Sequence, residues 1–140
     1  MQIHFHFETP AILKQRRQLK TFIADIINAE GKQAENLSFV FCSDQYILDI
    51  NKSFLQHDYY TDIISFTLSD ARVPIIGELY VSIETVKSNS ILFNSSINQE
   101  LHRVIFHGVL HLCGYGDKTK SQKKIMRQKE DAYLSLYFNS

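Results

Sequence analysis

The apolar residues of this chain switch between strand-like and helical spacing, and the order of these segments limits the folds that it can adopt. Apolar and polar residues alternate over residues 2–7, which predicts a strand. Short runs rich in β-branched and aromatic residues predict three more strands. These runs cover residues 37–42, 63–68 and 75–83.

Apolar residues recur at helical spacing in the segments between and after the strands. We expect Pro10 to open a first helix that ends near Asn28, and Ser43-Asp44 is a suitable N-cap for a second. This order of elements predicts an α+β fold with a mixed four-stranded sheet and about five helices. The other helices are predicted at residues 84–92, 97–112 and 121–136.

A chain of 140 residues with 44% hydrophobic side chains is suited to one domain, and we expect residues 1–140 to form it. The 15 basic and 15 acidic side chains give no formal net charge, which excludes a generally basic nucleic-acid binder. Neither a signal-peptide pattern nor an apolar stretch of membrane-spanning length is present in the sequence. We therefore expect a cytoplasmic protein with no membrane partner, in which Cys42 and Cys113 are free thiols.

The segment from His107 to Asp117 contains a candidate metal site. His107 and His111 are four residues apart on a predicted helix, so their imidazoles project from the same face. Gly114 can end that helix in a left-handed conformation, and the reversal would bring Asp117 back towards both histidines. We therefore predict that His107, His111 and Asp117 bind one divalent metal ion, with Zn²⁺ favoured, and leave a fourth position open.

The same spacing of ligands, His-x3-His-x2-Gly-x2-Asp, is found in metzincin zinc peptidases, so the helix is zincin-like. Those enzymes place a glutamate directly after the first histidine, where it serves as the general base. This chain has Gly108 at that position, which can neither accept nor donate a proton. A small zinc peptidase is therefore an alternative that the spacing suggests and Gly108 opposes.

Further motifs occur in a fixed order along the chain. The sequence His-Gly-Val-Leu-His-Leu-Cys-Gly-Tyr stands at residues 107–115, Thr-Asp-Ile-Ile-Ser-Phe at 61–66 and Gly-Glu-Leu at 77–79. Asn51 lies ten residues before the second of these motifs. On these motifs, residues 37–135 resemble the bacterial YbeY family of rRNA maturation factors and endoribonucleases.

The resemblance implies a zinc-dependent endoribonuclease that is specific for single strands and acts in late small-subunit rRNA maturation, at the 3′ end of 16S rRNA. It also implies action on the small ribosomal subunit, with a small-subunit ribosomal protein and an Era-type GTPase as partners. Two residues depart from the family pattern. Asp117 replaces a third histidine. Leu55 replaces an arginine that is implicated in the action of the family on RNA. Because Leu55 cannot clamp a phosphate, a non-catalytic ribosome-assembly factor with a structural metal is a third hypothesis.

The residues do not identify a general base. His57, Asp62 and Ser65 are candidates for an active-site role, and each has a competing structural explanation. A solvated loop explains His57, whereas capping or ending of a strand explains Asp62 and Ser65. His102 is five residues before His107 and faces away from the predicted ligands, so we expect it to lie on the surface.

Basic residues concentrate directly after the proposed third ligand. Residues 117–140 hold six of the 15 basic side chains but only three of the 15 acidic ones. A solvated helix face explains such a cluster by itself, but a basic rim beside a metal site suits a polyanionic substrate. The candidates for RNA binding are Lys118, Lys120, Lys123, Lys124 and Arg127.

Overall fold

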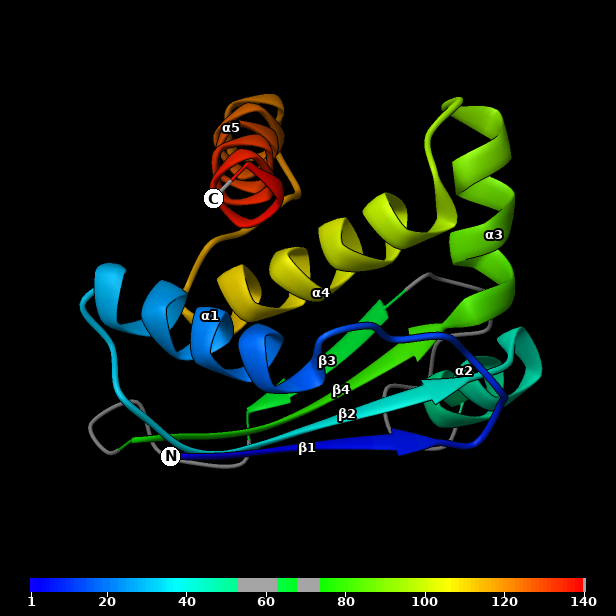
Figure 1. Ribbon diagram of the computed structural model, residues 1–140, viewed down its shortest axis with the longest axis horizontal. Coiled ribbons are helices and arrows are strands. Elements are labelled where there is room, and N and C mark those ends of the chain that lie inside the picture. Colours follow the sequence, from blue (N-terminus) through cyan, green and yellow to red (C-terminus); the bar gives the residue numbers. More distant parts are fainter. Residues whose placement is uncertain (53–62, 68–73, 140) are drawn as a thin grey trace.

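The computed structural model describes residues 1–52, 63–67 and 74–139, and only the backbone of residues 63–67. The helices and strands of these residues give an α+β fold with five helices, as predicted (Figure 1). In chain order they are β1 (Gln2–Phe7), α1 (Arg16–Ala29), β2 (Ala34–Cys42), α2 (Asp44–Ile50), β3 (Ile63–Thr67), β4 (Ile75–Ser82), α3 (Ile83–Leu92), α4 (Ile97–Leu112) and α5 (Lys120–Phe138).

The strands form one sheet in the order β1-β2-β4-β3. β1, β2 and β4 are parallel to one another, with Phe5 opposite Phe39 and Phe39 opposite Leu79. β3 runs antiparallel to β4 at the edge, where Ser65 lies opposite Leu79. Parallel neighbours need a crossover connection, and α1 supplies it between β1 and β2.

Side chains of β2 alternate between the two faces of the sheet. Leu37, Phe39 and Phe41 are fully buried in the main core. α1 and α4 cover this face of the sheet, and α5 packs on the outer side of α4 (Figure 1). Cys42 points the other way, into a smaller cluster with Ile47 of α2.

α4 is the central helix of the domain, and it spans the residues predicted from apolar spacing. It is apolar on most sides because it lies between the sheet and α5, so both of its faces are buried. Ser96 caps its first turn by accepting a hydrogen bond from the Gln99 backbone N–H at 3.0 Å. At its other end, Gly77 of β4 allows close approach, since a Cβ there would lie 2.9 Å from Leu112 Cδ1.

The first helix begins later than predicted, because Pro10 does not open it. α1 starts at Arg16, after Gln15 adopts a left-handed conformation with φ of 53°. The preceding segment is not helical and places Leu13 in the main core, where it is 6% exposed. Burial of Leu13 thus outweighs the helix-starting preference of Pro10. Among the described residues, no helix is both long and apolar enough to cross a membrane.

His102 is buried at 1% exposure, so the prediction of a surface residue was wrong. The end of α5 covers His102, whose ring lies 5.1 Å from the rings of both Tyr137 and Phe138. Its Nδ1 is 2.6 Å from the Asn98 carbonyl oxygen. Burial lowers the pKa of His102 below its ordinary value of 6.5, against the opposing effect of this hydrogen bond.

A buried neutral histidine makes the fold sensitive to acid. The unfolded chain takes up a proton at His102 near pH 6.5, which the folded chain resists, so the stability it contributes is present above that pH and is lost as the pH falls. When the pH is lowered from about 7 to about 5, we expect the free energy of unfolding of His102→Phe to fall less than that of the wild type, as measured by urea denaturation. The control His4→Gln, at an exposed position of β1, should behave as the wild type. If His102→Phe had the same pH dependence of stability as the wild type, burial of His102 would not be the cause of the sensitivity to acid.

Candidate metal centre

The two histidines of the predicted site lie one turn apart on α4 and turn their rings towards each other. The Nε2 atoms of His107 and His111 are 2.9 Å apart. Both side chains are partly accessible, at 21% and 24% exposure. The helix therefore presents two imidazole nitrogens at one point of the surface, as the four-residue spacing predicts.

Asp117 returns to this point because the chain reverses directly after α4. Gly114 has φ of 106°, a conformation that favours glycine, and the Tyr115 N–H donates back to the Leu110 carbonyl at 3.1 Å. The reversal places Asp117 Oδ2 3.3 Å from the Nε2 atoms of both histidines. One ligand atom from each of the three residues lies within 4.8 Å of the others.

The other nitrogen of each imidazole is held by an acceptor. His107 Nδ1 lies 2.6 Å from Glu130 Oε2, and His111 Nδ1 lies 2.8 Å from the carbonyl oxygen of Tyr115. An ionised carboxylate and a carbonyl only accept hydrogen bonds, so each Nδ1 carries the proton. Each Nε2 then directs a lone pair towards the shared point. Two such lone pairs at 2.9 Å and a carboxylate oxygen at 3.3 Å fit a cation bound between them.

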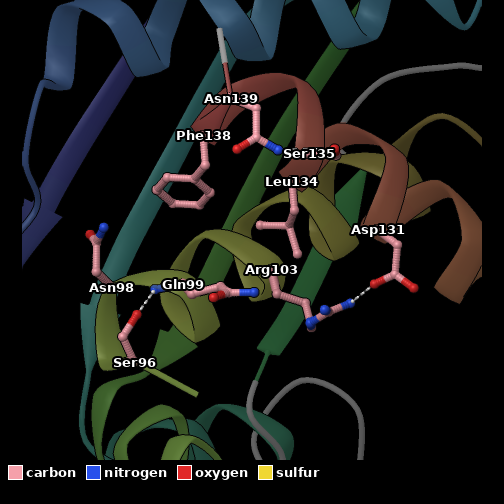
Figure 2. Close-up of a pocket in the computed structure, with 9 residues that line it drawn as sticks. All are labelled: Ser96, Asn98, Gln99, Arg103, Asp131, Leu134, Ser135, Phe138 and Asn139. Carbon is pink, nitrogen blue, oxygen red and sulfur yellow. Dashed lines mark hydrogen bonds and ion pairs between the residues drawn. The ribbon is translucent and has the colours of Figure 1, made fainter.

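Glu130 contacts a candidate ligand, and the sequence interpretation missed it. Its side chain is 6% exposed on α5 and also accepts a hydrogen bond from Arg103 of α4 at 3.2 Å. Arg103 in turn pairs with Asp131 at 2.8 Å, in the cleft between α4 and α5 (Figure 2). Glu130 is spaced like the buried residues Met126 and Leu134 of α5, and a carboxylate on that apolar stripe was the available signal.

The backbone that carries Asp117 is anchored from a distant part of the chain. Glu30, at the end of α1, accepts hydrogen bonds from the hydroxyls of Tyr115 and Tyr133, and Lys129 Nζ lies 3.2 Å from it. Burial alone would raise the pKa of Glu30, but these hydrogen bonds outweigh it and hold the pKa below its ordinary value of 4.5. The loop between His111 and Asp117 is therefore tied to both α1 and α5.

The five basic candidates for RNA binding are all exposed, on α5 and on the loop before it. Lys123 and Arg127 line the same surface pocket as His107 and Asp117. The remaining three candidates, Lys118, Lys120 and Lys124, lie beside them in the sequence.

The other predicted site residues fall outside this cluster or outside the described residues. His57, Asp62 and Leu55 lie outside the residues that the structure describes, and Ser65 is placed only as a backbone position in β3. The two thiols are buried, and burial raises the pKa of Cys42 to about 12 and that of Cys113 to about 11. Both cysteines therefore stay protonated at neutral pH and act as core residues.

Fold and site together define an α+β domain with a candidate metal centre on its central helix. A family model described as Endoribonuclease YbeY matches residues 3–137 of this chain. The chain belongs to the endoribonuclease YbeY family. This confirms the resemblance found in the motifs, and with it the enzyme class of the family, which is that of a nuclease hydrolase.

Curated relatives and a solved structure agree with this membership. Endoribonuclease YbeY of Cytophaga hutchinsonii is 47% identical over 132 residues, which cover 94% of this chain and 92% of the relative. That of Parabacteroides distasonis is 41% identical over 129 residues, or 92% of this chain and 89% of the relative. The solution structure of a Thermotoga maritima protein shares 27% identity with a TM-score of 0.66, and covers 99% of this chain and 90% of that one.

Replacing Glu130 tests the link between this buried carboxylate and the candidate ligands. Glu130→Gln keeps the shape of the side chain but removes the charge that orients His107 through Nδ1. We expect the affinity for Zn²⁺ to fall about 10-fold to 100-fold, measured by competition with a chromophoric chelator. Asp131→Asn is the matched control, because Asp131 is exposed and pairs with Arg103 rather than with a histidine. Equal zinc affinities for Glu130→Gln and the wild type would show that the contact does not orient a ligand.

Proposed function

We propose that residues 1–140 form a zinc-dependent endoribonuclease domain that cleaves single-stranded RNA in late small-subunit rRNA maturation, at the 3′ end of 16S rRNA. The observation that carries the proposal is the convergence of His107, His111 and Asp117 on one point, with each imidazole held by its other nitrogen. Membership in a family named for an endoribonuclease supports the reaction class.

Two imidazole nitrogens and one carboxylate oxygen form a donor set typical of catalytic zinc sites. When bound, zinc would supply a Lewis acid that stabilises negative charge on the scissile phosphate. The protein contributes orientation: Glu130 and the Tyr115 carbonyl fix the two rings, so the ligand atoms need little rearrangement. Asp117 keeps an oxygen donor where the family pattern has a histidine nitrogen, and zinc accepts either.

The exposed lysines and Arg127 beside the site would hold the RNA backbone through its phosphates. For proton transfer, we propose His57, Asp62 and Ser65 as candidates. In this proposal the protein works in the cytoplasm on rRNA and the small ribosomal subunit, with a small-subunit ribosomal protein and an Era-type GTPase as partners.

Leu55 favours one other function, that of a non-catalytic ribosome-assembly factor whose metal is structural. That position offers no guanidinium to bind a phosphate. A peptidase is disfavoured by Gly108, which is buried in α4 and has no side chain that could take up a proton.

A cleavage assay separates these three functions. We expect the zinc-loaded protein to cut a single-stranded rRNA precursor, to leave a duplex RNA and casein intact, and to lose activity with EDTA or the substitution His111→Ala. The matched control His4→Ala, on the exposed side of β1, should retain full activity. Both RNA substrates are followed by gel electrophoresis and casein by release of labelled peptides.

Each alternative outcome of this assay has a distinct meaning. Cleavage of casein but not of RNA would overturn the proposal in favour of a peptidase. If neither the single-stranded rRNA precursor nor casein is cleaved, and the protein still binds the small ribosomal subunit, the proposal would be overturned in favour of the assembly factor.

The basic residues of α5 generate a separate prediction. Reversing two charges with Lys123→Glu and Lys124→Glu should weaken binding to single-stranded RNA and flatten its salt dependence. The slope of log K against log salt concentration should shrink by about 0.7 for each phosphate that the variant no longer neutralises. Lys14→Glu with Lys20→Glu makes the same charge change on α1 and its preceding segment and should have little effect. An unchanged affinity in the α5 variant would mean that these lysines form only a solvated helix face.

A further inference from the structure

A pocket of about 590 Å³ opens directly beside the candidate metal centre. Two of the candidate ligands, His107 and Asp117, line it. The end of α3 provides a further wall through Asn89 and Phe93, and α5 contributes Lys123. The pocket thus continues the metal site along the surface, towards the end of α3, which contributes no residue to the metal site.

The α5 wall of the pocket carries positive charge that can face a ligand. Lys123 is exposed, and the Arg127 side chain is 57% exposed. Arg127 Nη1 lies 3.8 Å from Glu130 Oε1, which is longer than a hydrogen bond. Glu130 is instead engaged by His107 and Arg103, so the guanidinium of Arg127 keeps its donors for another acceptor.

The α3 wall offers an aromatic ring. Phe93 is the C-cap residue of α3 and is 59% exposed, although a phenylalanine gains most from burial. An exposed aromatic ring in the same pocket as cationic side chains is the combination with which proteins bind single-stranded nucleic acids, since the ring stacks on a base and the cations bind the phosphate. The Asn89 amide, on the same wall, has both a donor and an acceptor for the edge of a base.

We propose that this pocket is a nucleotide subsite of the metal centre, in which Phe93 stacks on an RNA base while Lys123 and Arg127 bind the adjoining phosphate. The inference rests on the proposed endoribonuclease function and deepens it. The nucleotide held in the pocket is a neighbour of the one whose phosphate lies at His107, His111 and Asp117. A duplex would keep its bases stacked on each other and unable to reach Phe93, so the subsite favours single strands.

Binding to a base-free analogue tests the stacking directly. Fluorescence anisotropy would compare a labelled single-stranded oligouridylate with an abasic ribose-phosphate chain of the same length. We expect the wild type to prefer the oligouridylate, and Phe93→Ala to lose about 5-fold to 100-fold in affinity for it but nothing for the abasic chain. Phe93→Trp should restore the preference. The matched control is Ile91→Ala, which removes an exposed apolar side chain of α3 outside the pocket.

A second pair of variants tests the phosphate contact. Lys123→Ala should weaken binding of the oligouridylate and of the abasic chain alike, whereas Lys87→Ala, at an exposed position of α3 outside this pocket, should change neither.

The outcomes distinguish the subsite from the proposed function. If the wild type binds and cleaves RNA while Phe93→Ala keeps its full affinity for the oligouridylate, the subsite is overturned and the endoribonuclease stands. If RNA is bound with the expected dependence on Phe93 but never cleaved, the endoribonuclease fails and the subsite stands. If the wild type does not distinguish the oligouridylate from the abasic chain, base stacking in this pocket is excluded.

Discussion

The contact between Glu130 and His107 joins the structural and chemical parts of this protein. A carboxylate buried at 6% exposure is costly unless charged or polar partners compensate it, and here His107 and Arg103 do so from α4. The contact holds α5 against α4 at the level of the candidate ligands. It also fixes the ring of His107 with Nε2 turned outward. Packing of two helices and orientation of a ligand therefore depend on one side chain.

The rest of the fold places α4 where this contact can form. Its lower face rests on the sheet, closely enough at Gly77 that a Cβ there would lie 2.9 Å from Leu112. Its upper face is covered by α5. Tyr115 extends the restraint into the loop after α4, because its carbonyl holds His111 and its hydroxyl reaches Glu30 at the end of α1. The ligand atoms are thus positioned by helices on both sides and by a short loop that is tied down at its centre.

What could be predicted from the sequence was mostly local. The limits of α4 followed from apolar spacing, and the meeting of His107, His111 and Asp117 followed from a helical repeat and a glycine. These features depend on residues fewer than about a dozen positions apart, where backbone geometry alone decides which side chains meet.

What could not be predicted depends on tertiary packing. The carboxylate of Glu30 meets the Tyr115 hydroxyl across 85 positions of sequence, and His102 is buried only because α5 folds back over α4. The segment from Pro10 to Gln15 stays outside the helix because Leu13 is needed in the core. The contact of Glu130 could have been predicted in part. A single acidic residue on an apolar stripe of a helix indicates that it has a buried partner, even before that partner is known.

The central claim is that His107, His111 and Asp117 bind a metal ion, and metal content measures it most directly. The purified protein would be loaded with zinc, freed of excess metal by gel filtration and analysed by inductively coupled plasma mass spectrometry, with circular dichroism to confirm folding. We predict about one zinc ion per chain for the wild type and for His4→Ala, and none for the folded double variant His107→Ala with His111→Ala. A wild type that retains no zinc, or a double variant that retains as much as the wild type, would contradict the account.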